Sequence, residues 1–163
     1  IKKYGSYYKP TDKAEVNFRN ENVFVGPAHL AGKIDRMEID KEHKTITVVD
    51  YKTGKSYEKW ESIPKLHRYR LQLYCYKILI EKSRSFAGYK VTSGRLMFVE
   101  PDANGRVNSL ELNFKDNELI ETEKLLQALW KHVHELNFPD VSEYEASLKG
   151  IRGFEQDLLD GNL

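Results

Sequence analysis

Two apolar segments on either side of a short polar one constrain the fold of this chain most. Residues 31–39 and 45–52 carry the apolar pattern of strands, and residues 40–44 are polar. Because a connection of this length joins antiparallel neighbours, we expect a β-hairpin. If Ile39 pairs with Ile46, the same register places Asp35 opposite Asp50. A slip of one residue would turn one apolar set toward water, whereas a slip of two residues would keep both sets buried and stays open.

A helix is predicted directly after this hairpin. Pro64 suits a first helical position, and residues 65–82 place apolar or aromatic side chains on one helical face. The side chains in this stripe are Leu66, Tyr69, Leu73, Tyr76 and Ile80.

The remaining segments complete an α/β pattern. Two strands are expected before the hairpin, at residues 14–19 and 22–25, and two after the helix, at 94–100 and 109–114. A second helix is expected from Asp116, as its N-cap, to about residue 137, and a short one around 154–159. This order predicts a central mixed β-sheet flanked by helices.

Length and cysteine content bound the class of protein. The 163 residues suffice for a single domain, 1–163, in which residues 140–163 form a polar acidic tail. The single cysteine excludes an intramolecular disulfide and any four-cysteine metal site, which favours an intracellular, cytoplasmic setting. No apolar run approaches a membrane span. Since the chain begins with Ile rather than Met, we expect a fragment, a processed chain or a chain that lacks its first residues.

The net charge of +1 conceals opposed blocks. Residues 1–51 carry 9 basic and 8 acidic groups, residues 52–95 carry 11 and 3, and residues 96–163 carry 6 and 14. The middle block is therefore at +8 and the last at −8. We expect the basic block to meet a polyanion and the acidic block to face away from it or toward a basic partner.

Two carboxylates and a lysine are the candidate catalytic residues. On their strands Asp50 and Lys52 share a face, and the expected register brings Asp35 opposite Asp50. Two like charges so placed are destabilising unless a cation joins them, and Mg²⁺ prefers one or two carboxylates together with water and phosphate oxygens. Lys52 would point into the same site and could orient a water molecule.

These residues resemble the ordered motifs of a known family. Asp35 in Gly32-Lys33-Ile34-Asp35-Arg36, then Asp50-Tyr51-Lys52-Thr53-Gly54, then Gln72 and Tyr76 on the helix are similar to the RecB-like branch of the PD-(D/E)XK nuclease superfamily. The resemblance implies a restriction-endonuclease-like core and a Mg²⁺- or Mn²⁺-dependent deoxyribonuclease. It implies an exonuclease of DNA recombination, repair or phage DNA processing, partnered with a helicase or recombination protein, in the cytoplasm or a host cytoplasm.

The same resemblance implies roles for individual residues. Asp35, Asp50 and the backbone carbonyl of Tyr51 would hold the metal, and Lys52 would be the catalytic lysine. Gln72 and Tyr76 would lie on the substrate side of the site.

The family's pattern is incomplete in this chain. It places a further acidic or histidine ligand on a helix before the first strand; no such helix is evident in residues 1–13, and Glu15 or His29 would be a substitute. The cysteine cluster that holds iron–sulfur in some relatives is missing. The alternatives are therefore a catalytically idle DNA-binding or scaffolding module of a helicase–nuclease assembly, and a site-specific endonuclease on the same fold.

The basic block supplies candidate DNA contacts. Cations near a helix N-terminus oppose its dipole, and a phosphate backbone would compensate them. The candidates are Lys55, Lys59, Lys65, His67, Arg68 and Arg70, with Trp60 as a core residue or a stacking platform. Of these, Lys55, Arg68 and Arg70 are the predicted substrate-binding residues.

Overall fold

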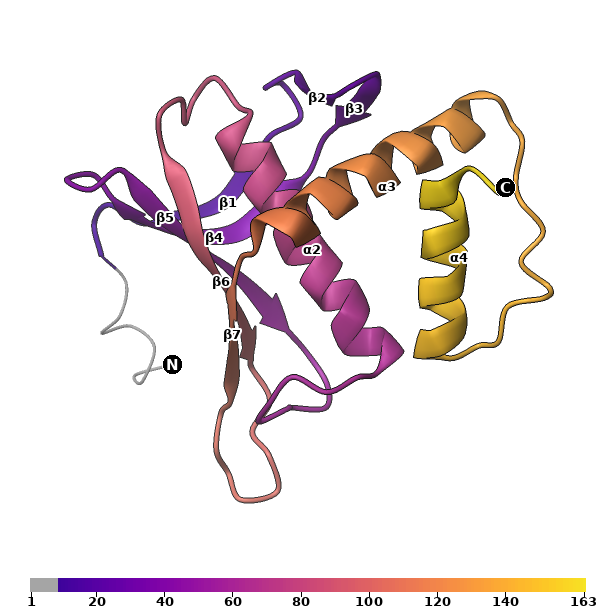
Figure 1. Cartoon of the computed structure of the whole chain (residues 1–163). Coiled ribbons are helices and arrows are strands. Elements are labelled where there is room, and N and C mark those ends of the chain that lie inside the picture. Colours follow the sequence, from indigo (N-terminus) through magenta and orange to yellow (C-terminus); the bar gives the residue numbers. More distant parts are fainter. Residues whose placement is uncertain (1–8) are drawn as a thin grey trace.

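A five-stranded mixed sheet with helices on one side forms the body of the protein (Figure 1). The computed structural model describes residues 9–163. The strand order is β1-β4-β5-β6-β7, and β5 and β6 are parallel whereas the other neighbours are antiparallel. The strands are β1 (Lys13–Asn17), β4 (Lys33–Asp40), β5 (Thr45–Lys52), β6 (Lys90–Phe98) and β7 (Ser109–Asn113). This architecture confirms the predicted α/β fold with a restriction-endonuclease-like core.

The β4–β5 hairpin has the predicted register. Met37 lies opposite Val48 and Ile39 opposite Ile46, and all four side chains are buried. The ladder continues to Arg36 opposite Val49, so that Asp35 and Asp50 follow at the next position. The alternation of apolar side chains selects this register because a slip of one residue would expose them.

Helix α2 (Pro64–Glu81) connects the parallel strands β5 and β6 and covers the central sheet. It buries Leu66, Leu73 and Ile80 against the strands in one continuous core. Gly94 on β6 permits this close approach, since a Cβ there would lie 3.0 Å from Leu73 Cδ1. The helix is thereby fixed over the end of β5 that carries Asp50.

Two further helices and a small hairpin complete the fold. Helix α3 (Asp116–His134) packs beside α2, and α4 (Leu148–Asp160) packs on α3 and touches α2 (Figure 1). A separate two-stranded sheet, β2 (Val23–Val25) and β3 (Ala28–Leu30), contacts α3. No helix within residues 9–163 combines the length and the apolar character needed to cross a membrane.

Several expected boundaries were wrong. The strand expected over 31–39 begins at Lys33, because residues 28–30 pair with β2 in the small hairpin. Strand β6 begins at Lys90, four residues before the expected start. Asp116 is the first helical residue rather than the N-cap, which is Lys115. Helix α3 ends at His134, and the short helix expected at 154–159 is the 13-residue α4 inside the acidic tail.

Candidate active site

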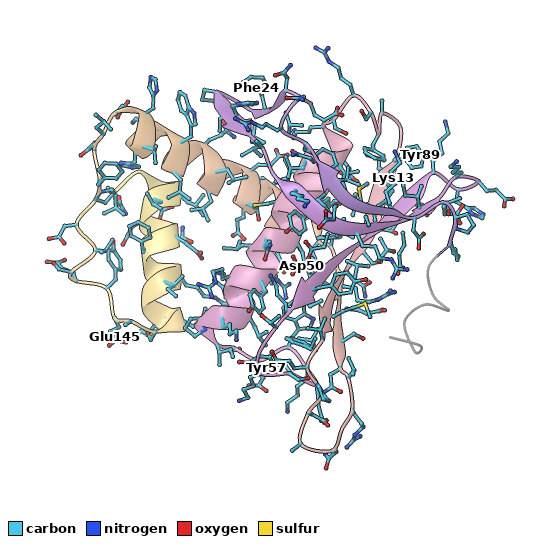
Figure 2. The ribbon with its side chains drawn as sticks, turned by 180° about the vertical axis from the view of Figure 1, so that it is seen from behind. Lys13, Phe24, Asp50, Tyr57, Tyr89 and Glu145 are labelled. Carbon is cyan, nitrogen blue, oxygen red and sulfur yellow. The ribbon has the colours of Figure 1, made fainter. Side chains whose placement is uncertain are left out.

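Asp50 is the buried centre of the candidate site. It lies near the end of β5 facing α2 (Figure 2), and 2% of the residue is exposed. Its Oδ1 accepts hydrogen bonds from the Tyr76 hydroxyl at 3.1 Å and from Gln72 Nε2 at 3.2 Å. Both donors come from α2, so the packing of that helix on the sheet positions them.

Lys52 closes this arrangement into a cluster. Its Nζ lies 2.6 Å from Asp50 Oδ2 and donates to Gln72 Oε1 at 2.6 Å. Gln72 Nε2 also donates to the Tyr76 hydroxyl at 2.6 Å, which in turn donates to Asp50. The amide of Gln72 therefore accepts from the ammonium through its oxygen and donates to the Asp50 carboxylate and the Tyr76 hydroxyl through its nitrogen, which explains a glutamine on an otherwise apolar helix face. The structure brings together the side chains of Asp50, Lys52, Gln72 and Tyr76.

Asp35 lies beside this cluster on β4. Its Oδ2 accepts a hydrogen bond from the backbone N–H of Tyr51 at 2.9 Å, so the residue between Asp50 and Lys52 is tied to it. The Tyr51 side chain is 39% exposed, and its hydroxyl accepts from Arg36 Nη1 at 3.4 Å. Both strands are thus locked at the position where the two carboxylates meet.

Electrostatics make the ionised form of Asp50 costly. Burial raises the pKa of Asp50, the Lys52 ammonium opposes that effect, and the charge of Asp35 adds to it. Burial also raises the pKa of Tyr76, and the neighbouring Asp50 adds to that rise, so the phenol remains a hydrogen-bond donor. On the same helix, burial raises the pKa of Cys75 to about 11, which makes this thiol a poor nucleophile.

The residues present fit a hard divalent cation. Asp35 and Asp50 supply two carboxylates on neighbouring strands, and the backbone carbonyl of Tyr51 lies between Asp50 and Lys52 in the sequence. Carboxylate and carbonyl oxygens are ligands of the kind that Mg²⁺ prefers. Asp50 Oδ2 is buried and, apart from its ion pair with Lys52 Nζ at 2.6 Å, has no hydrogen-bond partner among the described residues. A cation here would relieve both the burial of Asp50 and its repulsion by Asp35.

The expected substitutes for an upstream ligand lie elsewhere. Glu15 is opposite Asp35 in the β1–β4 register, but its side chain is exposed and pairs with Lys33 at 3.0 Å. His29 stacks on Phe24 in the small hairpin. Residues 9–163 contain no group of three His, Cys, Asp or Glu side chains that could hold a metal ion. Of the segment 1–13, where no ligand-bearing helix is expected, residues 1–8 lie outside the described part.

The structure divides the basic block into two groups. Arg70 forms a bidentate pair with Glu118 of α3, with Nε 2.8 Å from Oε2, and His67 Nε2 lies 2.8 Å from Glu155 of α4. In contrast, Lys55, Lys65 and Arg68 form no ion pair with a carboxylate in the described part of the chain. Among the predicted substrate-binding residues, Lys55 and Arg68 are therefore unpaired and Arg70 is paired.

One residue, Tyr69, has a role that the sequence analysis did not assign, and for Trp60 the structure selects one of the two expected roles. The Lys52 ammonium lies 4.1 Å from the centroid of the Tyr69 ring, which had been placed only in the apolar stripe. Its spacing of three residues from Gln72 was the available signal, because residues three apart share a helix face. Trp60 donates from Nε1 to the carbonyl of Glu111 at 2.7 Å and packs against the core, so it is a structural residue.

Comparison with known protein families identifies a superfamily for most of the chain. The family model described as the PD-(D/E)XK nuclease superfamily matches residues 2–148. This range contains β1 to α3 and every residue of the cluster around Asp50. No curated protein matches the chain.

Proposed function

Because this chain belongs to the PD-(D/E)XK nuclease superfamily, we propose that it hydrolyses DNA phosphodiester bonds with Mg²⁺ or Mn²⁺. The observation that carries the proposal is the closed cluster in which Lys52 bridges the buried Asp50 and Gln72. If Asp50 Oδ2 binds a cation, the N–H of Lys52 that faces this oxygen becomes available to a water molecule or a phosphate oxygen, while Gln72 still holds the ammonium.

Each residue then has a distinct task in hydrolysis. Asp35, Asp50 and the Tyr51 carbonyl would hold the cation, which when bound would polarise the scissile phosphate and make its phosphorus more electrophilic. Lys52 positions the attacking water through its Nζ and compensates the charge that develops on the phosphate oxygens. Tyr76 and Gln72 hold the Asp50 carboxylate in orientation through Oδ1.

The finer assignment to a RecB-like exonuclease rests on Gln72 and Tyr76. Gln72 and Tyr76 contact each other, and both contact Asp50. The two residues therefore have a function in the site in addition to the two acids and the lysine of the superfamily's general pattern. With Lys55, Arg68 and Arg70 as DNA contacts, such an enzyme would act on DNA ends in recombination, repair or phage DNA processing, in the cytoplasm, beside a helicase or recombination protein.

An idle DNA-binding module is the second candidate. The observation that favours it is the absence of a third metal-ligating side chain around Asp35 and Asp50 in residues 9–163. Such a module would bind DNA with the same basic groups and leave it intact.

Cleavage of linear and closed circular DNA tests both candidates. We expect wild type to degrade linear DNA in Mg²⁺ or Mn²⁺ and to spare closed circles, and we expect Lys52→Ala and Asp50→Ala to be inactive. Metal-dependent DNA binding without cleavage would instead support the idle module. Cleavage of closed circles would show an endonuclease.

A further inference from the structure

The aromatic ring of Tyr69 lies against the lysine on which the proposed hydrolysis depends. Lys52 Nζ is 4.1 Å from the centroid of that ring, well within the distance of about 6 Å over which a cation and an aromatic face attract each other. Tyr69 is on α2 three residues before Gln72, so both approach Lys52 from the same helix face.

These contacts account for every direction of the ammonium. A lysine ammonium has three N–H donors, and Lys52 has three neighbours: Asp50 Oδ2 at 2.6 Å, Gln72 Oε1 at 2.6 Å and the Tyr69 ring. Only 12% of the Lys52 side chain is exposed, so water competes little for it. Attraction between a cation and an aromatic face is stronger at such a partly desolvated position than at the surface.

The ring matters most when Asp50 binds a cation. Asp50 would then turn its charge toward the metal, and Gln72 and Tyr69 would remain as the partners of Lys52. Without the ring, the flexible four-carbon stem of Lys52 would have a single hydrogen bond to fix it. A group that must meet a reacting atom loses rate steeply when it is misplaced by about 1 Å.

We propose that Tyr69 is a positioning residue for the proposed hydrolysis, whose ring face holds the Lys52 ammonium in its reactive place. The proposal rests on the proposed function. The hydroxyl takes no part, because no hydrogen bond from it is found to any residue of the described chain. Lys65 Nζ at 5.9 Å and Arg68 Cζ at 6.0 Å from the ring centroid surround the same ring, so it lies where the unpaired cations approach the site.

Replacing the ring in steps tests this inference. We expect Tyr69→Phe to keep kcat within about twofold of wild type, because the aromatic face remains, and Tyr69→Leu to lower kcat about tenfold while KM changes much less. Pentafluorophenylalanine at position 69 retains the ring's shape but reverses its electrostatics, so it should behave like Tyr69→Leu. This third variant keeps the test decisive if leucine impairs folding.

Tyr89→Leu is the matched control. Tyr89 immediately precedes β6, at the end of the sheet opposite to the one that carries Asp50 (Figure 2). We expect this variant to keep the kcat of wild type. A Tyr69→Leu variant with wild-type kcat, or a Tyr69→Phe variant as impaired as Tyr69→Leu, would overturn the inference.

A measurement without turnover separates this inference from the proposed function. The ring current of Tyr69 should move the ε-methylene protons of Lys52 upfield in the metal-free protein, in wild type and in Tyr69→Phe but not in Tyr69→Leu. The signal is assigned by its absence in Lys52→Arg. If wild type does not cleave DNA, the proposed function fails but these shifts still test the contact. If the Lys52 shift is the same in Tyr69→Leu as in wild type, the positioning role is wrong.

Discussion

The ionised carboxylate of Asp50 lowers the stability of the fold at a position that the proposed hydrolysis needs. Its carboxylate is buried, faces Asp35 on the next strand and has a raised pKa, so the folded protein favours its neutral form. The cost of ionising it therefore appears as the pH rises above about 3.9, the usual pKa of an unfolded aspartate. A bound cation would offset this cost.

Neutralising Asp50 should stabilise the metal-free protein. We expect Asp50→Asn to raise the free energy of unfolding at pH 7 and to lose this advantage near pH 3, where the wild-type carboxyl is also protonated. Mg²⁺ at a hundredfold excess over its Kd should stabilise wild type by about 2.7 kcal/mol and Asp50→Asn far less. Urea denaturation at several pH values measures both effects.

The matched control for this prediction is Asp40→Asn. A hydrogen bond from the His43 backbone lowers the pKa of the exposed Asp40, so its neutral replacement should have the opposite sign and destabilise the protein. An Asp50→Asn variant less stable than wild type at pH 7 without metal would contradict the argument.

Asp12 and Arg36 form a second buried group of charges, on the face of the sheet away from α2. Arg36 Nη2 donates to Asp12 Oδ2 at 2.9 Å, and the two side chains are 5% and 1% exposed. Removing one partner of a buried pair costs up to about 3–5 kcal/mol. Since Arg36 Nη2 also lies 3.2 Å from Glu38 Oε1, we expect Asp12→Asn to lose stability in chemical denaturation by an amount below that limit.

An exposed pair on the neighbouring strands is the comparison for Asp12. Glu15 and Lys33 are 3.0 Å apart but 76% and 51% exposed. Surface pairs contribute about 0–1 kcal/mol, so Glu15→Gln should have a small effect. Equal effects of the two substitutions would contradict this account.

At the scale of elements, two faces of α2 contact two different parts of the fold. One face carries Tyr69, Gln72 and Tyr76 toward the end of β5, and the other carries Arg70 and Tyr74 toward α3. Tyr74 donates to Glu118 at 2.8 Å, and its hydroxyl also accepts from the backbone N–H of Lys115. The start of α3 is thus fixed to the helix that positions the site.

Glu118 should make this docking sensitive to pH. Burial opposes its ionisation, but hydrogen bonds from Arg70 and Tyr74 outweigh burial, and the pKa of Glu118 is lowered. A lowered pKa contributes stability that is present above about pH 4.5 and is lost as the pH falls through the lowered value. We expect Glu118→Gln to cost about 1.5–3 kcal/mol at pH 7, with the difference from wild type closing below pH 4.5. A pH-independent difference in urea denaturation would contradict this.

Elements with a strong apolar pattern could be predicted from the sequence, and elements without one could not. The pairing of β4 with β5 follows from the parity of Met37, Ile39, Ile46 and Val48, and with it the meeting of Asp35 and Asp50. Strand β2 matches the strand expected over 22–25, whereas its partner β3 was missed because a three-residue strand gives no periodicity. The contact of Tyr69 with Lys52 was missed because an aromatic residue in an apolar stripe resembles core.

At the scale of the whole molecule, the two opposed charge blocks meet each other in part. Glu118 and Glu155 of the acidic block pair with Arg70 and His67 of the basic block. This contact leaves Lys55, in the loop after β5, and Lys65 and Arg68, in the first turns of α2, without an ion pair to a carboxylate in the described part of the chain. A near-neutral chain therefore keeps a positive surface beside Lys52.

This arrangement predicts which cations determine the salt dependence of DNA binding. Each phosphate contact contributes about 0.9 to the slope of log K against log salt on duplex DNA, so Lys65→Ala with Arg68→Ala should reduce that slope by about 1.8. Arg70→Ala should change it less, because Arg70 is held by Glu118. Fluorescence anisotropy at a series of salt concentrations measures the slopes. An unchanged slope in the double variant would contradict the assignment of this surface.

The half-buried Cys75, the chain's one cysteine, offers a measure of the motion of α2. Its raised pKa of about 11 and its partly buried position slow reaction with alkylating reagents while the helix packs on the sheet. A local opening of the helix, which also carries Gln72 and Tyr76, should therefore speed the modification. The rate of labelling, followed by mass spectrometry, would report how often α2 opens locally at the site. A cation or DNA that stabilises the closed site should slow the reaction.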